Sequence, residues 1–572
     1  MTKKEVEVNR RGILKSIPVG AAFALTACAN PDDQQSNVIP IDFNHGVASG
    51  DPLQDRVIIW TRVSPIETSF SGQIGVSWQV AFDMSFANII SSGTFSTDAD
   101  RDFTVKQDVV GLEAGTQYYY RFMVGEKYSV IGEVKTLNSG GTEPVNLAVA
   151  SCSNYPFGYF NGYRAIAENG PFDAVLHLGD YIYEYEEGRY GSPNAAKMGR
   201  LLDPPHEITT LSDYRRRYAL YRADEDLQEV HRKYPFICAW DDHEFANNSY
   251  ATGAQNHSDD EGDWTTRRRE ATKAYMEWMP VRVDLTELPT VRSFTFGKLA
   301  TLAMLDTRIV GRDRPLEYGR DVEQMEIEGP NGAQLKPDYA AFHKRLETED
   351  RSLLGSSQEN WLEETLSKSA AENIPWQILG QQIIMSYRPE PPLSEVFSKE
   401  EISGFPAGEQ LSMMVAEELG GFYNPDAWDG YQLARRRVFD MFEKHAGNPI
   451  VLTGDTHCGW AMSLTDKLDG KHYGAEFAVP GITSPGRGER LPKVEEIEKA
   501  YYKHLNHMAY ANIKNRGYMT LTITEEDSIA RFYAVSTVES KEFDLELKKS
   551  LRYKAGDGED GKILLEDITE KS

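Results

Sequence analysis

The 572-residue sequence predicts an all-β sandwich followed by a larger α/β domain. From 43 to 136, apolar residues come in short runs of strand length that Gly and Asp separate, and no helical pattern intervenes. After a polar Asn-Ser-Gly-Gly-Thr stretch at 138–142, apolar strands mix with helical patterns, as is typical of α/β proteins. The length itself is too great for one ordinary core. We therefore predict at least two domains.

The chain begins with a predicted export signal. Arg10 and Arg11 precede an apolar run at 17–27 that is too short to span a bilayer. This arrangement resembles a twin-arginine export signal. The run ends in Leu-Thr-Ala-Cys, which makes Cys28 a candidate for lipidation, and cleavage after Ala29 without lipid is the alternative. We expect a periplasmic or cell-surface protein, exported by the twin-arginine machinery and anchored to a membrane through lipid on Cys28.

The spacing of apolar residues, and the turn-forming residues between them, predict the remaining strands and helices. In the N-terminal region, strands are predicted at 57–60, 74–80 and 118–124. In the α/β region, strands are predicted at 145–150, 174–178, 236–240, 299–305, 376–379 and 450–452, and helices near 162–169, near 264–278 and after a capping-box pattern, Ser356-x-x-Glu359. Long loops are expected around 185–235 and 306–355. The predicted organisation is a signal at 1–28, a linker at 29–40, a β-sandwich domain at 41–137, an α/β domain at 145–536 and a charged C-terminal helix or tail at 537–572.

Charge and cysteine content limit the partners and the redox chemistry. The 61 Lys and Arg against 88 Asp and Glu give a net charge of −27. Such a chain is repelled by nucleic acid and by anionic lipid, so we expect no nucleic-acid-binding surface. Besides Cys28, the cysteines are Cys152, Cys238 and Cys458, and three cysteines cannot form a paired disulfide framework. Cys238 lies within an apolar strand and is predicted to be a core residue.

Four polar motifs each follow an apolar strand. They are Ala-Ser-Cys-Ser-Asn at 150–154, Gly-Asp-Tyr-Ile-Tyr-Glu at 179–184, Trp-Asp-Asp-His-Glu-Phe-Ala-Asn-Asn at 240–248 and Gly-Asp-Thr-His-Cys at 454–458. A carboxylate directly after a glycine is typical of a tight turn that points side chains into a cleft. One such motif is usually only a turn. Together they predict a multi-metal hydrolytic site, because carboxylates bridge hard cations and imidazole completes their coordination.

The combined pattern resembles the calcineurin-like metallophosphoesterases and, within them, the PhoD-type alkaline phosphatases and phosphodiesterases. Residues 45–62 are similar to the start of that family's N-terminal β domain, and 179–184 and 240–244 are its most specific motifs. The resemblance implies an immunoglobulin- or fibronectin-like sandwich before a metallophosphoesterase domain with two central sheets flanked by helices. The Asp-x-His that opens the site in most of the superfamily is replaced by Ser-Cys-Ser at 151–153, which favours the PhoD branch.

The resemblance also implies an iron(III) ion with nearby calcium ions. Its iron ligands would be Cys152, Asp180, Tyr183 and His457, while Asp180 and Asp455 would also reach calcium. Anionic thiolate, phenolate and carboxylate suit a trivalent ion, whereas calcium prefers oxygen. Asp242 stands where relatives have the Asn of Gly-Asn-His-Glu, so Asp242 is expected to bind metal, and His243 to stabilise the phosphate or protonate the leaving oxygen. Asn247 or Asn248 could also bind calcium, and Cys458 is either inert or in contact with the metal.

We therefore expect an exported alkaline phosphatase that hydrolyses phosphate monoesters and diesters by metal-activated hydroxide, acting as a monomer. His243 and Asp242 are its predicted catalytic residues. No Gly-x-Ser-x-Gly elbow is present to supply a serine nucleophile. One alternative is a phospholipase D or a dedicated phosphodiesterase at the same site. An alternative of another class is a lipid-anchored binding protein with a vestigial metal site, against which the full set of ligand types argues.

Overall fold

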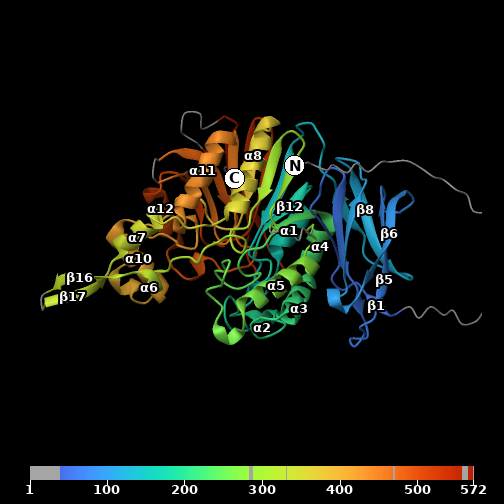
Figure 1. The fold of residues 1–572 in the computed structure, drawn as a ribbon, viewed down its shortest axis with the longest axis horizontal. Helices are drawn as coiled ribbons and strands as arrows, with labels where there is room; N and C mark the ends of the chain where they lie inside the picture. The colour runs from blue at the N-terminus through green and yellow to red at the C-terminus, as the bar shows by residue number, and fades with distance from the viewer. Residues whose placement is uncertain (1–38, 283–287, 330–331, 468–469, 557–564, 571–572) are drawn as a thin grey trace, which may run out of the picture. The chain divides into compact units, whose positions relative to one another are not determined.

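A computed structural model describes residues 39–282, 288–329, 332–467, 470–556 and 565–570. Two large sheets form the centre of the fold, and helices cover the outer face of each (Figure 1). The strand-rich N-terminal region and the mixed core of sheets and helices that follows it are both as predicted. The predicted export signal, including Cys28, and most of the linker lie outside the described residues.

The first sheet has ten strands in the order β26-β25-β24-β23-β11-β12-β13-β2-β3-β7. They are β26 (Glu566–Asp567), β25 (Leu545–Lys554), β24 (Asp527–Val535), β23 (Arg516–Ile523), β11 (Val145–Ala150), β12 (Ala174–Leu178), β13 (Pro235–Ala239), β2 (Val47–Gly50), β3 (Arg56–Arg62) and β7 (Thr104–Val110). Strands β11, β12, β13 and β2 run parallel. The carboxyl ends of β11, β12 and β13 therefore meet at one edge, where ligand sites of such sheets form.

The second sheet has seven strands in the order β14-β15-β18-β19-β21-β20-β22. They are β14 (Arg292–Phe296), β15 (Ala300–Met304), β18 (Trp376–Gly380), β19 (Asn448–Thr453), β21 (His472–Ala478), β20 (Gly459–Thr465) and β22 (Met508–Asn512). The inner faces of the two sheets share one apolar core, to which Leu147 and Leu176 contribute from the first sheet and Ile378 and Ile450 from the second. This core holds the two sets of strand ends against each other.

Helices pack on the outer face of each sheet. On the ten-stranded sheet lie α1 (Asn161–Asn169), α3 (Leu211–Arg222), α4 (Glu225–Lys233) and α5 (Trp264–Trp278), and on the seven-stranded sheet lie α8 (Ser356–Ala371) and α11 (Gln432–His445). The others are α2 (Ala195–Met198), α6 (Tyr318–Asp321), α7 (Tyr339–Thr348), α9 (Lys399–Ile402), α10 (Ala407–Leu419) and α12 (Val494–His504). Helix α5 begins where the side chain of Asp263 accepts a hydrogen bond from the Thr266 amide, and it buries Trp264, Ala271 and Trp278 on one face.

The N-terminal region contributes strands to both its own sheet and the ten-stranded sheet. Its own sheet contains β10 (Gly132–Lys135), β8 (Gln117–Val124), β5 (Ile74–Ala81), β6 (Ile89–Thr97) and β9 (Lys127–Tyr128), and β1 (Ile41–Asp42) pairs with β4 (Ser64–Pro65). Strands β2, β3 and β7, which also precede residue 137, instead extend the ten-stranded sheet beyond β13. The predicted domain boundaries and the immunoglobulin-like character of this region stay predictions.

Most predicted elements of the α/β region are confirmed, and four expectations differ. Helix α8 begins at Ser356, but its N-cap is Gly355 and no side chain caps it, so the capping box is wrong: Ser356 already has helical geometry. The expected loop at 185–235 contains α2, α3 and α4. The expected loop at 306–355 contains α6, α7 and the hairpin of β16 (Gln324–Gly329) and β17 (Gly332–Pro337). Within the expected helix or tail, 545–554 forms β25, because Leu551 and Tyr553 alternate into the core.

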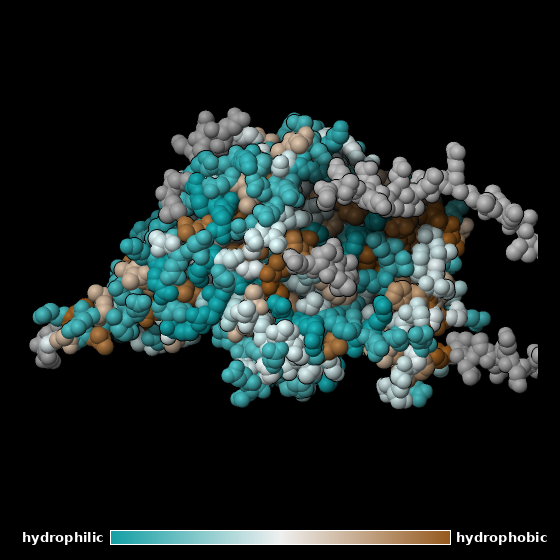
Figure 2. All heavy atoms as spheres, viewed as in Figure 1, coloured by the Kyte–Doolittle hydropathy of each residue, from teal (hydrophilic) through white to brown (hydrophobic). Residues whose placement is uncertain are grey.

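The surface over α8 and α11 is mostly hydrophilic (Figure 2), in keeping with the large excess of acidic residues. In the part of the chain that the structure describes, none of the helices has the length and apolar character needed to cross a membrane.

Candidate metal centre

The first three polar motifs meet because tight turns end parallel strands side by side. The amide of Cys152 donates to the carbonyl of Gly179 at 3.1 Å, and the amide of Ser153 donates to the carbonyl of Asp180 at 2.9 Å. Gly179 has a φ of 99°, and a Cβ there would lie 2.3 Å from the Cβ of Asp241. Only glycine fits this position, because the backbone is left-handed and the next turn lies against it.

The backbone of these turns is strained at several predicted ligands. Four of the predicted metal ligands have left-handed backbones, namely Cys152 (φ 59°), Asp180 (54°), Asp455 (59°) and His457 (58°). For a residue with a Cβ this conformation costs about 1–2 kcal/mol. Strain of this kind persists where the surrounding structure fixes it, and it is typical of functional sites.

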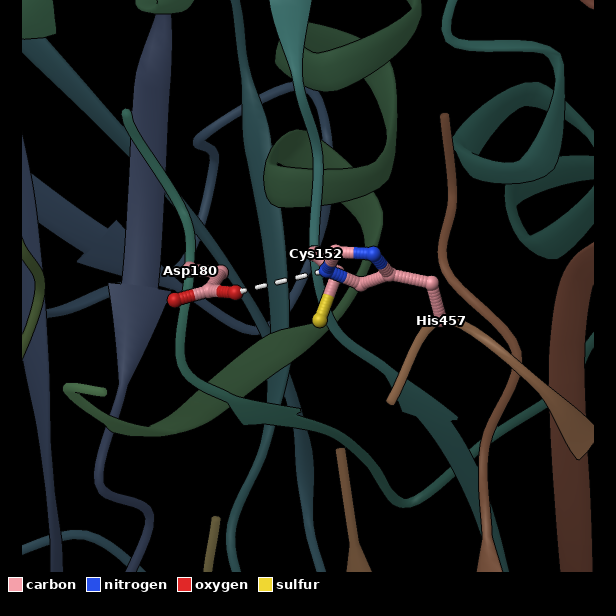
Figure 3. Close-up of side chains that lie close together, drawn as sticks. All are labelled: Cys152, Asp180 and His457. Carbon is pink, nitrogen blue, oxygen red and sulfur yellow. Dashed lines mark ion pairs between the residues drawn. The ribbon is translucent and has the colours of Figure 1, made fainter. Parts of the chain in front are cut away.

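Cys152, Asp180 and His457 form the first of three ligand groups. In each group, every side chain offers one possible metal-binding atom, and these atoms all lie within 4.8 Å of one another. Figure 3 shows the three side chains close together, with Nε2 of His457 3.8 Å from Oδ2 of Asp180. The hydroxyl oxygen of Tyr183 lies 3.0 Å from Asp180 Oδ2 and 3.2 Å from His457 Nε2. The four predicted iron ligands therefore converge on one place.

The tautomer of His457 follows from its other nitrogen. Its Nδ1 lies 2.9 Å from the carbonyl oxygen of Pro485, so Nδ1 carries the proton and donates it. The lone pair of Nε2 then faces Asp180 and Tyr183, as metal coordination by imidazole requires.

The second ligand group is Asp180, Asp242 and His243, and the third is Asp241, Asp242 and Asp455. Asp180 therefore belongs to two groups, and so does Asp242. One buried carboxylate oxygen of each of Asp180, Asp241 and Asp242 has no hydrogen-bond partner. Because buried carboxylate oxygens without donors are costly, they fit hard cations, which prefer oxygen ligands. The donor set thus fits hard metal cations, in line with the multi-metal site that the four motifs predict.

Arg308 lies fully buried among four carboxylates. Its guanidinium nitrogens are 2.5 Å from Asp241 Oδ1, 2.8 Å from Asp426 Oδ2 and 2.8 Å from Asp455 Oδ1. The distance to Asp242 Oδ1 is 3.7 Å. Arg312, also buried, lies 2.6 Å from Asp426 Oδ1, so two guanidinium groups face four carboxylates. This excess of acidic groups suits the binding of cations.

His243 is held by a second buried acid. Its Nδ1 lies 2.6 Å from Oε2 of Glu184, and Oε1 of the same carboxylate accepts a hydrogen bond from the Asn247 amide at 2.8 Å. Burial alone would lower the pKa of His243, but the carboxylates of Asp242, Glu184 and Asp180 outweigh it and hold this pKa well above its usual value. The imidazole is therefore held in its protonated form, so within the second ligand group Asp180 and Asp242 are the side chains left to bind a cation.

The identity of the chain follows from its comparison with known proteins. Residues 147–532 match the PhoD-like phosphatase family, and 27–138 match the N-terminal domain of that family. The chain belongs to the PhoD-like phosphatases. It is 33% identical over 533 residues to alkaline phosphatase D of Bacillus subtilis (strain 168), covering 90% of this chain and 82% of that one. A solved structure described as "Structure of PhoD" matches with a TM-score of 0.73 and 30% identity, over 93% of this chain and 92% of that one.

Membership confirms the resemblance drawn from the motifs at 179–184 and 240–244. The PhoD-like phosphatases are metallophosphoesterases, so this chain is a phosphoric ester hydrolase and a metal-dependent enzyme. In the part of the chain that the structure describes, the three ligand groups are the places that offer metal ligands.

Burial in this PhoD-like phosphatase opposes ionisation of several predicted ligands. Burial and then the charge of Asp180 raise the pKa values of the Cys152 thiol and the Tyr183 phenol well above their usual range. Burial also raises the pKa of Asp455 to about 7. A metal that binds these groups must displace their protons, so metal binding and proton release are coupled.

The residues that the sequence left open lie in different surroundings. The amide of Asn248 donates to Asp242 Oδ2 at 2.6 Å, whereas the side chain of Asn247 donates to Gln255 Oε1 at 2.8 Å. Cys458 is buried in an apolar cluster, with its sulfur 3.9 Å from the Ile513 carbonyl oxygen, and it belongs to none of the three ligand groups. Cys458 is thus a core residue.

Sequence reasoning gave no role to Glu184 or Asp241, although both stand inside the quoted motifs. It missed Arg308 altogether, because Arg308 lies in a segment predicted to be a loop. A signal was present for the first two, since each is an acid directly beside a predicted site residue. For Arg308 the partners are remote in sequence, and no local pattern indicates them.

Proposed function

We propose that the chain is an exported alkaline phosphatase that hydrolyses phosphate monoesters and diesters at a mixed metal centre. The observation that carries this proposal is the position of Asp180 in two ligand groups at once. One group contains Cys152 and His457, and the other contains Asp242 and His243. A carboxylate shared in this way can bridge two cations, one near Cys152 and His457 and one near Asp242, with the protonated imidazole of His243 acting as an acid and not as a ligand.

The proposed ions are iron(III) and calcium. Cys152, Asp180, Tyr183 and His457 would hold iron(III), and Asp180, Asp242 and Asp455 would hold calcium, with Asn248 better placed than Asn247 to assist. When bound, the ions would lower the pKa of a water molecule and offset the charge of the phosphate. His243 would donate its Nε2 proton to the leaving oxygen. Glu184 would keep the imidazole in place during that transfer.

Metal analysis together with assays on three esters tests the proposal. Protein purified without added metal should contain iron and calcium, and a Tyr183-bound iron(III) should colour it purple or brown. Chelating calcium should abolish hydrolysis of a nitrophenyl monoester and of a diester, and calcium should restore it where magnesium does not. A colourless, active protein with zinc alone would refute the iron assignment. Turnover of a phospholipid alone would assign a phospholipase D, and no turnover by the metal-loaded protein would favour a binding protein.

Export through the twin-arginine machinery is supported by the arginine pair before the short apolar run. Replacing Arg10 and Arg11 by Lys should keep the protein inside the cell. Cys28→Ser should release it from membranes with unchanged activity. A wild-type mature protein that begins at Asn30 and carries no lipid would refute the anchored form and leave simple cleavage. A monomer is expected from gel filtration.

A further inference from the structure

The 480–486 loop, Pro-Gly-Ile-Thr-Ser-Pro-Gly, contacts three of the four proposed iron ligands. Ser484 Oγ lies 2.5 Å from the hydroxyl oxygen of Tyr183 and 2.8 Å from the carbonyl oxygen of Cys152. The next residue, Pro485, accepts the Nδ1 proton of His457. Ser484 itself is fully buried. No sequence motif pointed to this loop, because it lies far from all three ligands along the chain.

The single hydroxyl proton of Ser484 faces two acceptors. The Cys152 carbonyl oxygen also lies 3.2 Å from the Ser484 amide and 3.3 Å from the Thr483 amide. It is therefore satisfied without the hydroxyl, which leaves that proton for Tyr183. The Tyr183 oxygen in turn lies 3.0 Å from Asp180 Oδ2. The row Ser484, Tyr183, Asp180 thus fixes the phenol oxygen from two sides.

We propose that Ser484 is a positioning residue whose hydroxyl holds the Tyr183 phenol oxygen in the geometry that binds iron(III). This inference rests on the proposed function, in which Tyr183 is an iron ligand. Ser484 is fully buried, and it acts through the ligand to which it donates a hydrogen bond. Outer contacts of this kind orient metal ligands, and their loss usually weakens metal affinity by about 10–100-fold.

The neighbouring Thr483 gives a matched control. Its Oγ1 donates to the carbonyl oxygen of Asn154 at 2.8 Å, and it too is fully buried, but its side chain touches none of the proposed ligands. Ser484→Ala and Thr483→Val each remove one buried hydroxyl from the same loop. Any effect that both share reports on the loop, and an effect of Ser484→Ala alone reports on the metal site.

The test is the loss of iron from the intact protein to excess desferrioxamine, followed by elemental analysis and by the visible absorption band. Ser484→Ala should lose iron about 10–100-fold faster than the wild type and shift the band, while Thr483→Val should do neither. Ser484→Thr, which keeps the hydroxyl, should restore slow loss. Ser484→Cys, a weaker donor, should fall between them, so the result does not depend on the folding of the alanine variant.

Two results would overturn the inference: Ser484→Ala keeps iron and its band as the wild type does, or Thr483→Val loses iron equally fast. Failure of the proposed function has a different outcome, because the wild type itself would then contain no iron or hydrolyse esters equally well without metal.

Discussion

Nδ1 of His243 lies 2.6 Å from Oε2 of Glu184, and both side chains are buried. Because Nδ1 is engaged, Nε2 is the nitrogen that can meet a substrate oxygen. The pair thus fixes both the direction and the charge of the imidazole, which is the arrangement that a general acid requires.

Replacing His243 tests that role directly. His243→Ala should lower turnover about 10²–10⁴-fold, the usual range for losing an acid–base group, and should leave iron and calcium bound. The loss should be smaller for nitrophenyl esters, whose leaving group needs less protonation. Loss of the metals, or equal slowing of all esters, would contradict the assignment.

Replacing Glu184 tests whether it acts through His243. Glu184→Gln keeps the shape of the side chain and removes the charge that orients and protonates the imidazole. We expect a smaller loss of turnover than in His243→Ala, and a double variant no slower than His243→Ala, because two residues that act as a unit are not additive. The exposed Glu187→Gln is the control and should leave turnover unchanged. Additive losses in the double variant would show that Glu184 acts elsewhere.

Asp180 is the predicted bridge between ions. Asp180→Asn removes its charge from both groups that contain it, so metal content and turnover should fall together. Cys458→Ser, in the apolar cluster, should leave the metal content unchanged. Elemental analysis of both variants with a single-ester assay measures this. Full metal content in Asp180→Asn would exclude a bridging role.

Arg308 is the buried counter-charge of the acidic cluster. Arg308→Met leaves Asp241, Asp242 and Asp455 without their guanidinium, while Asp426 keeps its ion pair with Arg312, and breaking a buried ion pair in this way costs about 3–5 kcal/mol of stability. The urea midpoint in chelator should fall accordingly, and added calcium should recover part of the loss. The exposed Arg314→Met should change the midpoint little. An unchanged midpoint for Arg308→Met would show that the cluster does not depend on this charge.

Burial of His177 should make the folded protein less stable in acid. Burial lowers its pKa from 6.5 to about 3, so between these values only the unfolded chain takes up the proton. The contribution of neutral His177 to the free energy of unfolding is present in full above pH 6.5 and is lost as the pH drops toward 3. At pH 5 the loss is about 2 kcal/mol. His177→Gln should reduce the difference in unfolding free energy between pH 7.5 and pH 5 by about 2 kcal/mol. The exposed His504→Gln should leave this difference unchanged. An unchanged difference in His177→Gln would refute the argument.

The parts of the site that local signals encode were predictable. Strand β12 and the turn at Gly179 and Asp180 follow from an apolar run and a glycine, so the position of Asp180 could be inferred from a few residues. Family resemblance then supplied the expectation that Tyr183 binds metal. The contacts of Arg308 and Ser484 could not be predicted, because each depends on segments that only the folded sheets bring together.

The strands shared between the N-terminal region and the ten-stranded sheet have a consequence for how the protein is made. Gly50 of β2 pairs with Phe236 of β13, so the nascent chain cannot complete this part of the sheet until residue 236 has left the ribosome. A fragment that ends before residue 137 would contain β2 without its partner strand β13. A fragment that starts after residue 137 would expose β13 as an unpaired edge strand, which is prone to self-association. We therefore expect neither fragment to fold alone, and engineered forms of this phosphatase should keep both regions.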